Sequence, residues 1–221
     1  NDKHSIDLIS FIGQSRNGQG WIGSTKEDIM NDSKVNGCTE NEYDRFIQNI
    51  NKVHYKGFLG SNLIFNASVY YNFLTGYYLF DVDNFMQKVI DSTWGYTGEI
   101  DTYHLQHHML GGNAAIKYYI KDFKLTAGTN FSTFSRNHIG TTTLSPDSLW
   151  NNIGYKNDVN VFIKGEYEYK GLNILLNLQY RHADFDYKGD LAFDKLNWDF
   201  FNWSAKASYN LKDNHTFYFS A

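Results

Sequence analysis

Three histidines lie close together in the sequence and could bind a metal ion. His104, His107 and His108 follow Asp101 closely, and imidazole and carboxylate groups are common metal ligands. The surrounding residues predict a strand, in which successive side chains point to opposite faces. His107 and His108 therefore cannot share a face, and at most His104 and His108 do. We expect solvated histidines at the rim of the structure rather than a metal site.

Two further pairs of side chains have the chemistry of an anion-binding site. Arg16 and Trp21 fall in a segment after the first expected strand, and Arg136 and His138 follow the fifth. A guanidinium group binds a carboxylate or phosphate through two parallel hydrogen bonds, and aromatic rings add contact area. We take these four residues as the candidate ligand contacts.

Catalytic chemistry has weaker support. Asp101, His107, His138 and Asp147 are the nominal acids and bases of a hydrolase, but their spacing shows no paired pattern. Cys38 is the single cysteine, so neither a disulfide framework nor a cysteine-based zinc site can form, and we expect an inert loop residue. No glycine-rich phosphate loop is present. The sequence predicts a protein that is not an enzyme and has no cofactor.

The clearest element that positions these residues is a hairpin over residues 158–187. Apolar and polar residues alternate along both arms, and this period of two is typical of a strand with one apolar face. The apolar set is Val159, Val161, Ile163, Gly165, Tyr167 and Tyr169 in the first arm and Leu172, Ile174, Leu176, Leu178 and Tyr180 in the second. Phe162 and Leu175 are the exceptions. Lys170-Gly171 predicts a tight turn between arms that are longer than the roughly five or six residues of a usual strand.

The same pattern predicts nine strands along the chain. They cover residues 4–14, 45–59, 63–81, 103–120, 123–136, 158–169, 172–187, 198–211 and 216–221. Tight turns are expected at 60–62, 121–122, 170–171 and 212–215. Longer irregular loops are expected at 15–44, 82–102, 137–157 and before residue 198. Long and short connections therefore alternate, which puts all long loops at one end of an up-and-down meander.

This organisation favours a membrane barrel. Outer-membrane barrels have long loops on one side, short turns on the other, and a band of apolar side chains between aromatic girdles. From Leu63 to Tyr71 the outward row rises about 20 Å at about 3.3 Å per residue and a tilt of about 40°. Aromatic residues make up 18% of the chain, and the expected girdles contain Tyr118, Tyr169 and Tyr209 below and Phe73 and Phe201 above. We predict an all-β fold, an antiparallel up-and-down meander of about nine long strands that is part of a transmembrane β-barrel.

Composition is compatible with this fold without proving it. The mean hydropathy is −0.51 and apolar runs are short, as expected when half of each strand faces a wet interior. The net charge of −4 argues against a nucleic-acid partner. A soluble β-sandwich or a lipocalin-like barrel remains an alternative, in which the apolar face would form a dry core. Charged residues on the polar face, such as Lys117, Lys164 and Glu166, disfavour a small closed barrel.

Four segments resemble the barrel of TonB-dependent outer-membrane receptors, in particular the type found in Bacteroidetes. They are Gln19-Gly20-Trp21-Ile22-Gly23; Asn66-Ala67-Ser68-Val69-Tyr70-Tyr71 with Gly76-Tyr77-Tyr78; Leu178-Gln179-Tyr180-Arg181-His182; and Phe200-Phe201-Asn202 leading to Lys206-Ala207-Ser208-Tyr209-Asn210-Leu211. Two positions depart from the family pattern, since Leu79 replaces the usual acidic residue and Trp203 the common proline. The segments occur in the family's order and cover most of the chain.

The resemblance implies a receptor in the bacterial outer membrane that binds a scarce ligand, such as a ferric siderophore or other metal chelate, and imports it. Energy would come from the TonB–ExbB–ExbD complex, acting on a plug domain. Because residues 1–221 contain neither a plug nor the roughly 22 strands of such a barrel, we expect a fragment of a longer receptor. An outer-membrane protease or phospholipase and a soluble ligand-binding or adhesive β-domain remain the alternatives.

Overall fold

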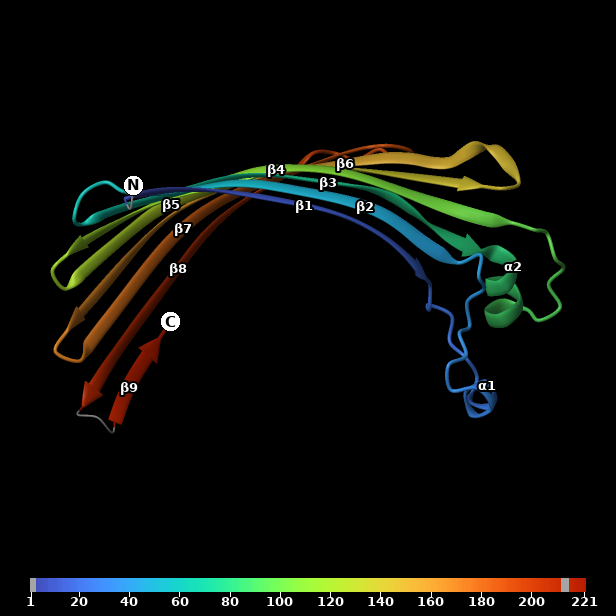
Figure 1. Cartoon of the computed structure of the whole chain (residues 1–221), viewed down its shortest axis with the longest axis horizontal. Coiled ribbons are helices and arrows are strands. Elements are labelled where there is room, and N and C mark those ends of the chain that lie inside the picture. Colours follow the sequence, from blue (N-terminus) through green and yellow to red (C-terminus); the bar gives the residue numbers. More distant parts are fainter. Residues whose placement is uncertain (1–2, 212–214) are drawn as a thin grey trace.

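One antiparallel sheet contains every strand of the structure. The computed structural model describes residues 3–211 and 215–221. Within these residues nine strands lie in the order β1-β2-β3-β4-β5-β6-β7-β8-β9, each paired with the next along the chain. The sheet is strongly curved, like part of the wall of a cylinder (Figure 1). The predicted all-β meander is confirmed.

The strands are long except for the last. They are β1 (His4–Gly18), β2 (Tyr43–Phe58), β3 (Leu63–Asp81), β4 (Ile100–Ile120), β5 (Phe123–Thr142), β6 (Ser145–Tyr169), β7 (Leu172–Lys188), β8 (Leu196–Leu211) and β9 (His215–Ser220). Two of the predicted tight turns have the expected backbone. Lys170 and Gly171 have φ of 46° and 84° and Lys121 has φ of 49°, the left-handed conformations that a two-residue hairpin requires. The turn predicted at 212–215 lies largely outside the described residues.

The prediction of irregular structure was wrong in three places. Short helices occupy two of the expected loops, namely α1 (Lys26–Asn31) in the first and α2 (Val82–Phe85) with the π-helical turn η1 (Met86–Ile90) in the second. Thr25 caps α1 and Asp81 caps α2, each through a side-chain oxygen that accepts a backbone N–H. Among residues 3–211 and 215–221, no helix is both long and apolar enough to cross a bilayer.

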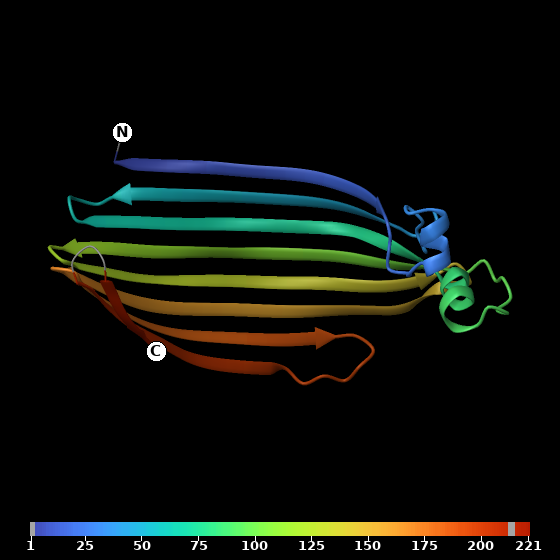
Figure 2. The ribbon, with the colours of Figure 1, turned by 90° about the horizontal axis from the view of Figure 1, so that it is seen from below.

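The third error concerns residues 137–157, which form strand rather than loop. β5 and β6 remain paired beyond the expected strand end, with His138 opposite Asn152 and Gly140 opposite Trp150. The register shifts only near Thr141 and Thr142, so Pro146 lies where the ladder is already irregular, a position that proline tolerates. The predicted alternation of long and short connections therefore fails here. Figure 2 shows the helices and this hairpin at the same end of the sheet, opposite the tight turns.

The two faces of the sheet differ as the alternation predicted. In an antiparallel sheet, directly opposite residues share a face, and the register aligns Val69 with Gly112, Phe131 and Val159 across four strands. Large apolar side chains of this outward face are exposed, for example Leu176 at 57%. Four of the buried strand side chains, Ser68, His107, Thr126 and Ala183, lie on the opposite, polar face, and the buried Asp81 at the loop end of β3 lies on the outward face. Curvature crowds the side chains of a concave face, so the polar face is the inner one.

Leu175 and Leu176 provide a direct test of which face meets lipid. We expect Leu176→Lys to lower stability in a bilayer by about 2–4 kcal/mol, because a lysine in the middle of a lipid-facing strand must leave water. Leu175→Lys makes the same chemical change on the neighbouring residue, but on the polar face and opposite Glu166. It should be tolerated. The fraction of the intact protein that folds into phospholipid vesicles, measured as heat-modifiable gel migration, compares the two variants; equal losses would contradict the assignment of the faces.

Candidate ligand-binding site

Two of the four candidate residues line one hollow at the loop end of the polar face. Arg136 and His138 lie on β5, within the strand rather than after it as predicted. The hollow has a volume of about 430 Å³, and β6 and β7 supply its other walls. Its lining includes Phe134, Trp150, Asn152, Lys156, Phe185 and Tyr187. Two basic side chains, a histidine and several aromatic rings therefore converge there, which suits an anion with a flat apolar surface.

Arg136 is held in place without being neutralised. Its Nη2 donates to Nδ1 of His107 at 3.3 Å, and its guanidinium carbon lies 5.2 Å from the centre of the Phe134 ring. Its Nε is buried and has no partner among the described residues, and neither has Nε2 of His107. Since buried polar groups normally have partners, the site retains hydrogen-bonding capacity and positive charge that a ligand can use.

A series of aromatic rings connects the first loop to this hollow. Trp21 packs on Tyr78 with ring centres 5.7 Å apart, Tyr78 stacks on Tyr103 at 4.9 Å, and Tyr103 contacts Trp150 at 5.4 Å. Gly140 lies between Tyr103 and Trp150 in the sheet. A Cβ at Gly140 would lie 2.5 Å from the Trp150 ring, so only glycine lets the indole cross β5. Trp21, the third candidate, is therefore linked to the hollow through Tyr78 and Tyr103.

Arg16, the fourth candidate, does not belong to this group. It lies on β1 and not in the first loop, and it is exposed on the outward face, opposite Arg45. Its guanidinium carbon lies 4.2 Å from the centre of the Tyr43 ring. The structure thus brings Arg136 and His138 together, links Trp21 to the hollow through a series of ring contacts, and places Arg16 on the other face of the sheet.

Two buried carboxylates fix the loops above the site. Glu42, which is 1% exposed, accepts hydrogen bonds from Nε1 of Trp21 and Nδ2 of Asn84, both at 2.8 Å, and from the backbone N–H of Thr39. It therefore joins the loop after β1 to the loop after β3. The indole of Trp21 is positioned by this bond at its Nε1 and by a T-shaped contact with the Tyr78 ring.

Asp83 holds the second loop, which follows β3, together through hydrogen bonds within that loop. It accepts from the backbone N–H groups of Thr97 and Gly98, at 3.0 and 2.7 Å, and from the side chains of Thr97 and Trp94. Burial alone would raise the pKa of Asp83. The hydrogen bonds outweigh that effect and hold its pKa below the ordinary value of 3.8, so the loop depends on the charged carboxylate.

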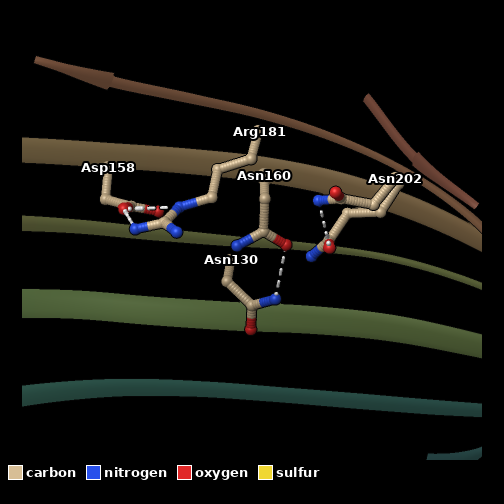
Figure 3. Close-up of polar contacts among 6 residues, drawn as sticks. Asn130, Asp158, Asn160, Arg181 and Asn202 are labelled. Atoms are coloured by element: carbon tan, nitrogen blue, oxygen red, sulfur yellow. Dashed lines mark hydrogen bonds and ion pairs between the residues drawn. The ribbon is translucent and has the colours of Figure 1, made fainter. Parts of the chain in front are cut away.

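Farther from the loop end, the polar face carries separate pairs of bonded side chains (Figure 3). Asn130 donates to Asn160 at 2.9 Å, and Arg181 binds the Asp158 carboxylate through Nε at 2.8 Å and also through Nη2. Lys124 and Lys164 both pair with Glu166, at 2.6 and 3.2 Å. Pairing of this kind neutralises part of the charge on this face of the sheet.

The three histidines considered for metal binding do not share one face. His104 and His108 share the outward face while His107 is buried on the polar face, as the alternation predicted. His108 bonds through Nδ1 to the Tyr71 hydroxyl at 2.7 Å. In the part of the chain that the structure describes, no group of three or more His, Cys, Asp or Glu side chains is placed to hold a metal ion.

Comparison with known proteins identifies a fold. No protein-family model matches the chain, and no curated protein matches its sequence. Solved structures do match: the ferric citrate transporter FecA, at a TM-score of 0.80 and 10% identity, and the ferric-catecholate import receptor Fiu from E. coli K12, at 0.72 and 11%. The chain has the fold of a TonB-dependent receptor barrel. The match covers 99% of this chain and 33% of FecA, and 98% of this chain and 43% of Fiu.

A third match shows that this fold accommodates more than one kind of cargo. The copper transporter OprC is similar to 96% of this chain at a TM-score of 0.68 and 14% identity, over 33% of its own length. Because this chain spans less than half of each of these three proteins, it corresponds to part of a barrel wall.

Sequence reasoning missed the residues that complete the hollow. Gly140, Trp150 and Asn152 fell within the expected loop, although residues 150, 152, 154 and 156 continue the period of two along the polar face of β6. Extending the alternation backwards from residue 158 would have found Trp150 and Asn152. Tyr78 and Tyr103 carry no such signal, because aromatic residues occur on both faces.

Gly140→Ala tests the path of the Trp150 ring. The added methyl group collides with the indole, so we expect Trp150 to leave Tyr103 and stability to fall by about 1–3 kcal/mol. Near-ultraviolet circular dichroism should lose the signal that Trp150→Phe also removes. Gly154→Ala is the matched control on the same face, since its methyl group would meet Phe185 at an ordinary 3.4 Å. An unchanged spectrum for Gly140→Ala would refute the packing described above.

The lowered pKa of Asp83 predicts that the loop after β3 opens in acid. Because its pKa is lowered in the folded state, its contribution is fully present above the unfolded value and is lost as the pH falls through the folded value. The protection factors of the amides of Thr97 and Gly98, which are corrected for the intrinsic pH dependence of exchange, should therefore fall below about pH 4. Asp83→Asn should show low protection factors at neutral pH and little further change in acid. A pH-dependent loss of protection that persists in Asp83→Asn would assign the effect to another group.

Proposed function

We propose that this chain is part of the wall of an active-transport receptor in the bacterial outer membrane. The observation that carries the proposal is the two-faced curved sheet, apolar outside and polar inside, with a basic and aromatic hollow at its long-loop end. Apolar residues such as Leu176 and Val161 would contact the bilayer. Long loops of outer-membrane barrels face the exterior, so the hollow would face the medium from which ligand arrives.

The proposed ligand is a scarce metal chelate such as a ferric siderophore. Such ligands are often anionic, and Arg136 supplies a guanidinium with an unused donor while His138, Trp150 and Tyr187 supply ring surfaces. FecA and Fiu are by name transporters of ferric chelates, which supports this class of ligand. Trp21 would contribute through the loops, and Arg16 faces away from the hollow.

Transport requires parts beyond residues 1–221. We propose a longer protein in which a plug domain fills the barrel and the TonB–ExbB–ExbD complex supplies energy to move it. This sheet would then be passive, and its paired interior charges would let a hydrated ligand pass. The Bacteroidetes type suggested by the four sequence segments stays a prediction.

Two alternative functions predict different experimental results. A barrel protease or phospholipase would require the intact protein to cleave a basic peptide or a phospholipid, with activity lost in His138→Ala. A soluble ligand-binding or adhesive domain would give a monodisperse protein without detergent. Either result would replace the transporter proposal.

Binding of a panel of ligands to the intact protein tests the proposal most directly. Ferric chelates, haem and cobalamin are titrated, and we expect a ferric chelate to bind. Arg136→Ala should weaken that binding by about 10- to 100-fold, the effect of losing a hydrogen bond to a charged group. Lys117→Ala removes one positive charge from the polar face near the tight turns and should leave affinity unchanged. Equal effects of both substitutions would point to overall charge rather than to this hollow.

A further inference from the structure

A row of basic and aromatic side chains crosses the outward face of β1 to β4 at the loop end of the sheet. Arg16 lies opposite Arg45, Arg45 opposite Tyr77, and Tyr77 opposite His104. We call these four residues the basic row. They share a face with Val69 and the rest of the apolar band, and Arg16, Arg45 and His104 are exposed.

The two arginines are neighbours of like charge. Directly opposite residues in an antiparallel pair have Cβ atoms only about 4.5–5.5 Å apart, and like charges there are destabilising. Within the described residues, neither guanidinium takes part in an ion pair or a side-chain hydrogen bond. An anion held between Arg16 and Arg45 would turn this repulsion into attraction.

The aromatic neighbours hold Arg16 in a conformation suited to such an anion. Its guanidinium carbon lies 4.2 Å from the centre of the Tyr43 ring, and Tyr43 in turn lies against Tyr77, with ring centres 6.2 Å apart. Stacking on a ring leaves the N–H donors at the edge of the guanidinium free. The row therefore offers a preorganised set of donors that no side chain in the described residues uses.

Charge on the outward face is segregated between the two halves of the sheet. On β1 to β4 the acidic residue of this face is Asp81, which is buried and bonded to Thr39 and Asn84. Acidic side chains of the same face gather instead on β7 and β8, where Asp184 and Asp199 lie. An anion that approaches the outer wall therefore meets net positive charge only over the first four strands of the described sheet.

The height of the basic row matches the head groups of a bilayer. Tyr77 lies four residues beyond Phe73 along β3, a rise of about 10 Å at 3.3 Å per residue and a tilt of about 40°. Phe73 belongs to the expected upper girdle, which marks the edge of the hydrocarbon, and the head-group layer extends roughly 5–8 Å further. The arginines reach this layer with the length of their side chains.

We propose that the basic row binds the phosphate group of a lipid in the outer leaflet, with the acyl chains lying on the apolar band below it. Arg16 and Arg45 would bind the phosphate, and Tyr77 and His104 would contact the rest of the head group. The site rests on the proposed membrane location but does not depend on the transported ligand. It would fix the orientation and depth of this part of the wall in its leaflet.

Native mass spectrometry of the intact protein, titrated with phosphatidic acid or phosphatidylcholine, tests the site. We expect one phosphatidic acid to bind more tightly than phosphatidylcholine, and Arg16→Gln/Arg45→Gln to weaken its binding roughly 30-fold, since each arginine near a membrane surface contributes about 1 kcal/mol and about 1.4 kcal/mol corresponds to tenfold. Lys52→Gln/Lys56→Gln is the control, because it removes two charges from the polar face of β2, the strand that also carries Arg45. It should leave lipid binding unchanged. Arg45→Lys, which keeps the charge, should retain most of it.

Three results would overturn the site: equal binding of both lipids, equal loss in the control variant, or displacement of the lipid by excess inorganic phosphate, which would indicate a site for free anions. Folding of each variant is checked by heat-modifiable migration. If the double variant does not fold, Arg45→Gln alone replaces it. A protein that does not enter bilayers at all would refute the proposed function, whereas one that enters them with unaltered lipid binding in the arginine variants would refute only this inference.

Discussion

The structure depends on the two-residue period of an antiparallel sheet. Directly opposite residues share a face, so the alternation of apolar and polar residues in one strand must be in register with the alternation in the next. A slip of one residue between β5 and β6 would turn Val161 and Ile163 inward and expose Asn160 and Lys164 to the apolar side. Continuous pairing without crossovers from β1 to β9 therefore keeps the apolar wall and the polar interior separate over the whole sheet.

At the loop end, aromatic contacts such as those of Trp21 with Tyr78 and Phe80 are combined with hydrogen bonds to buried carboxylates. Glu42 ties the first loop to the second, and Asp83 closes the second on itself. Hydrogen bonds to charged groups are stronger than those between neutral groups, so a small number of them can order a long segment. Trp21 is held in this way against Tyr78, so a loop residue joins the series of aromatic rings that leads to the hollow.

Sequence reasoning succeeded where local pattern decides the structure. The limits of β3 and the turn at Lys170 and Gly171 follow from alternation and from turn chemistry, and both were predicted. It failed at residues 137–157, because a proline and several polar residues resemble a loop when the partner strand is ignored. Only the pairing of β5 with β6 shows that these residues continue the sheet. The helices after Thr25 and Asp81 are too short to show periodicity, so their capping residues were the sole signal.

The same pairing explains why the candidate site could be predicted only in part. Arg136 and His138 were found by residue type and by their place after a strand. The residues that line the other sides of the hollow belong to β6 and β7, and their position could not be predicted without the pairing of these strands. Gly140 is decisive here. It has no side chain, so it looks like a loop residue, yet this absence lets Trp150 cross β5 and meet Tyr103. A surface of contacting aromatic rings thus depends on a residue that contributes no side chain to it, and such a dependence becomes visible only when the neighbouring strands are in register.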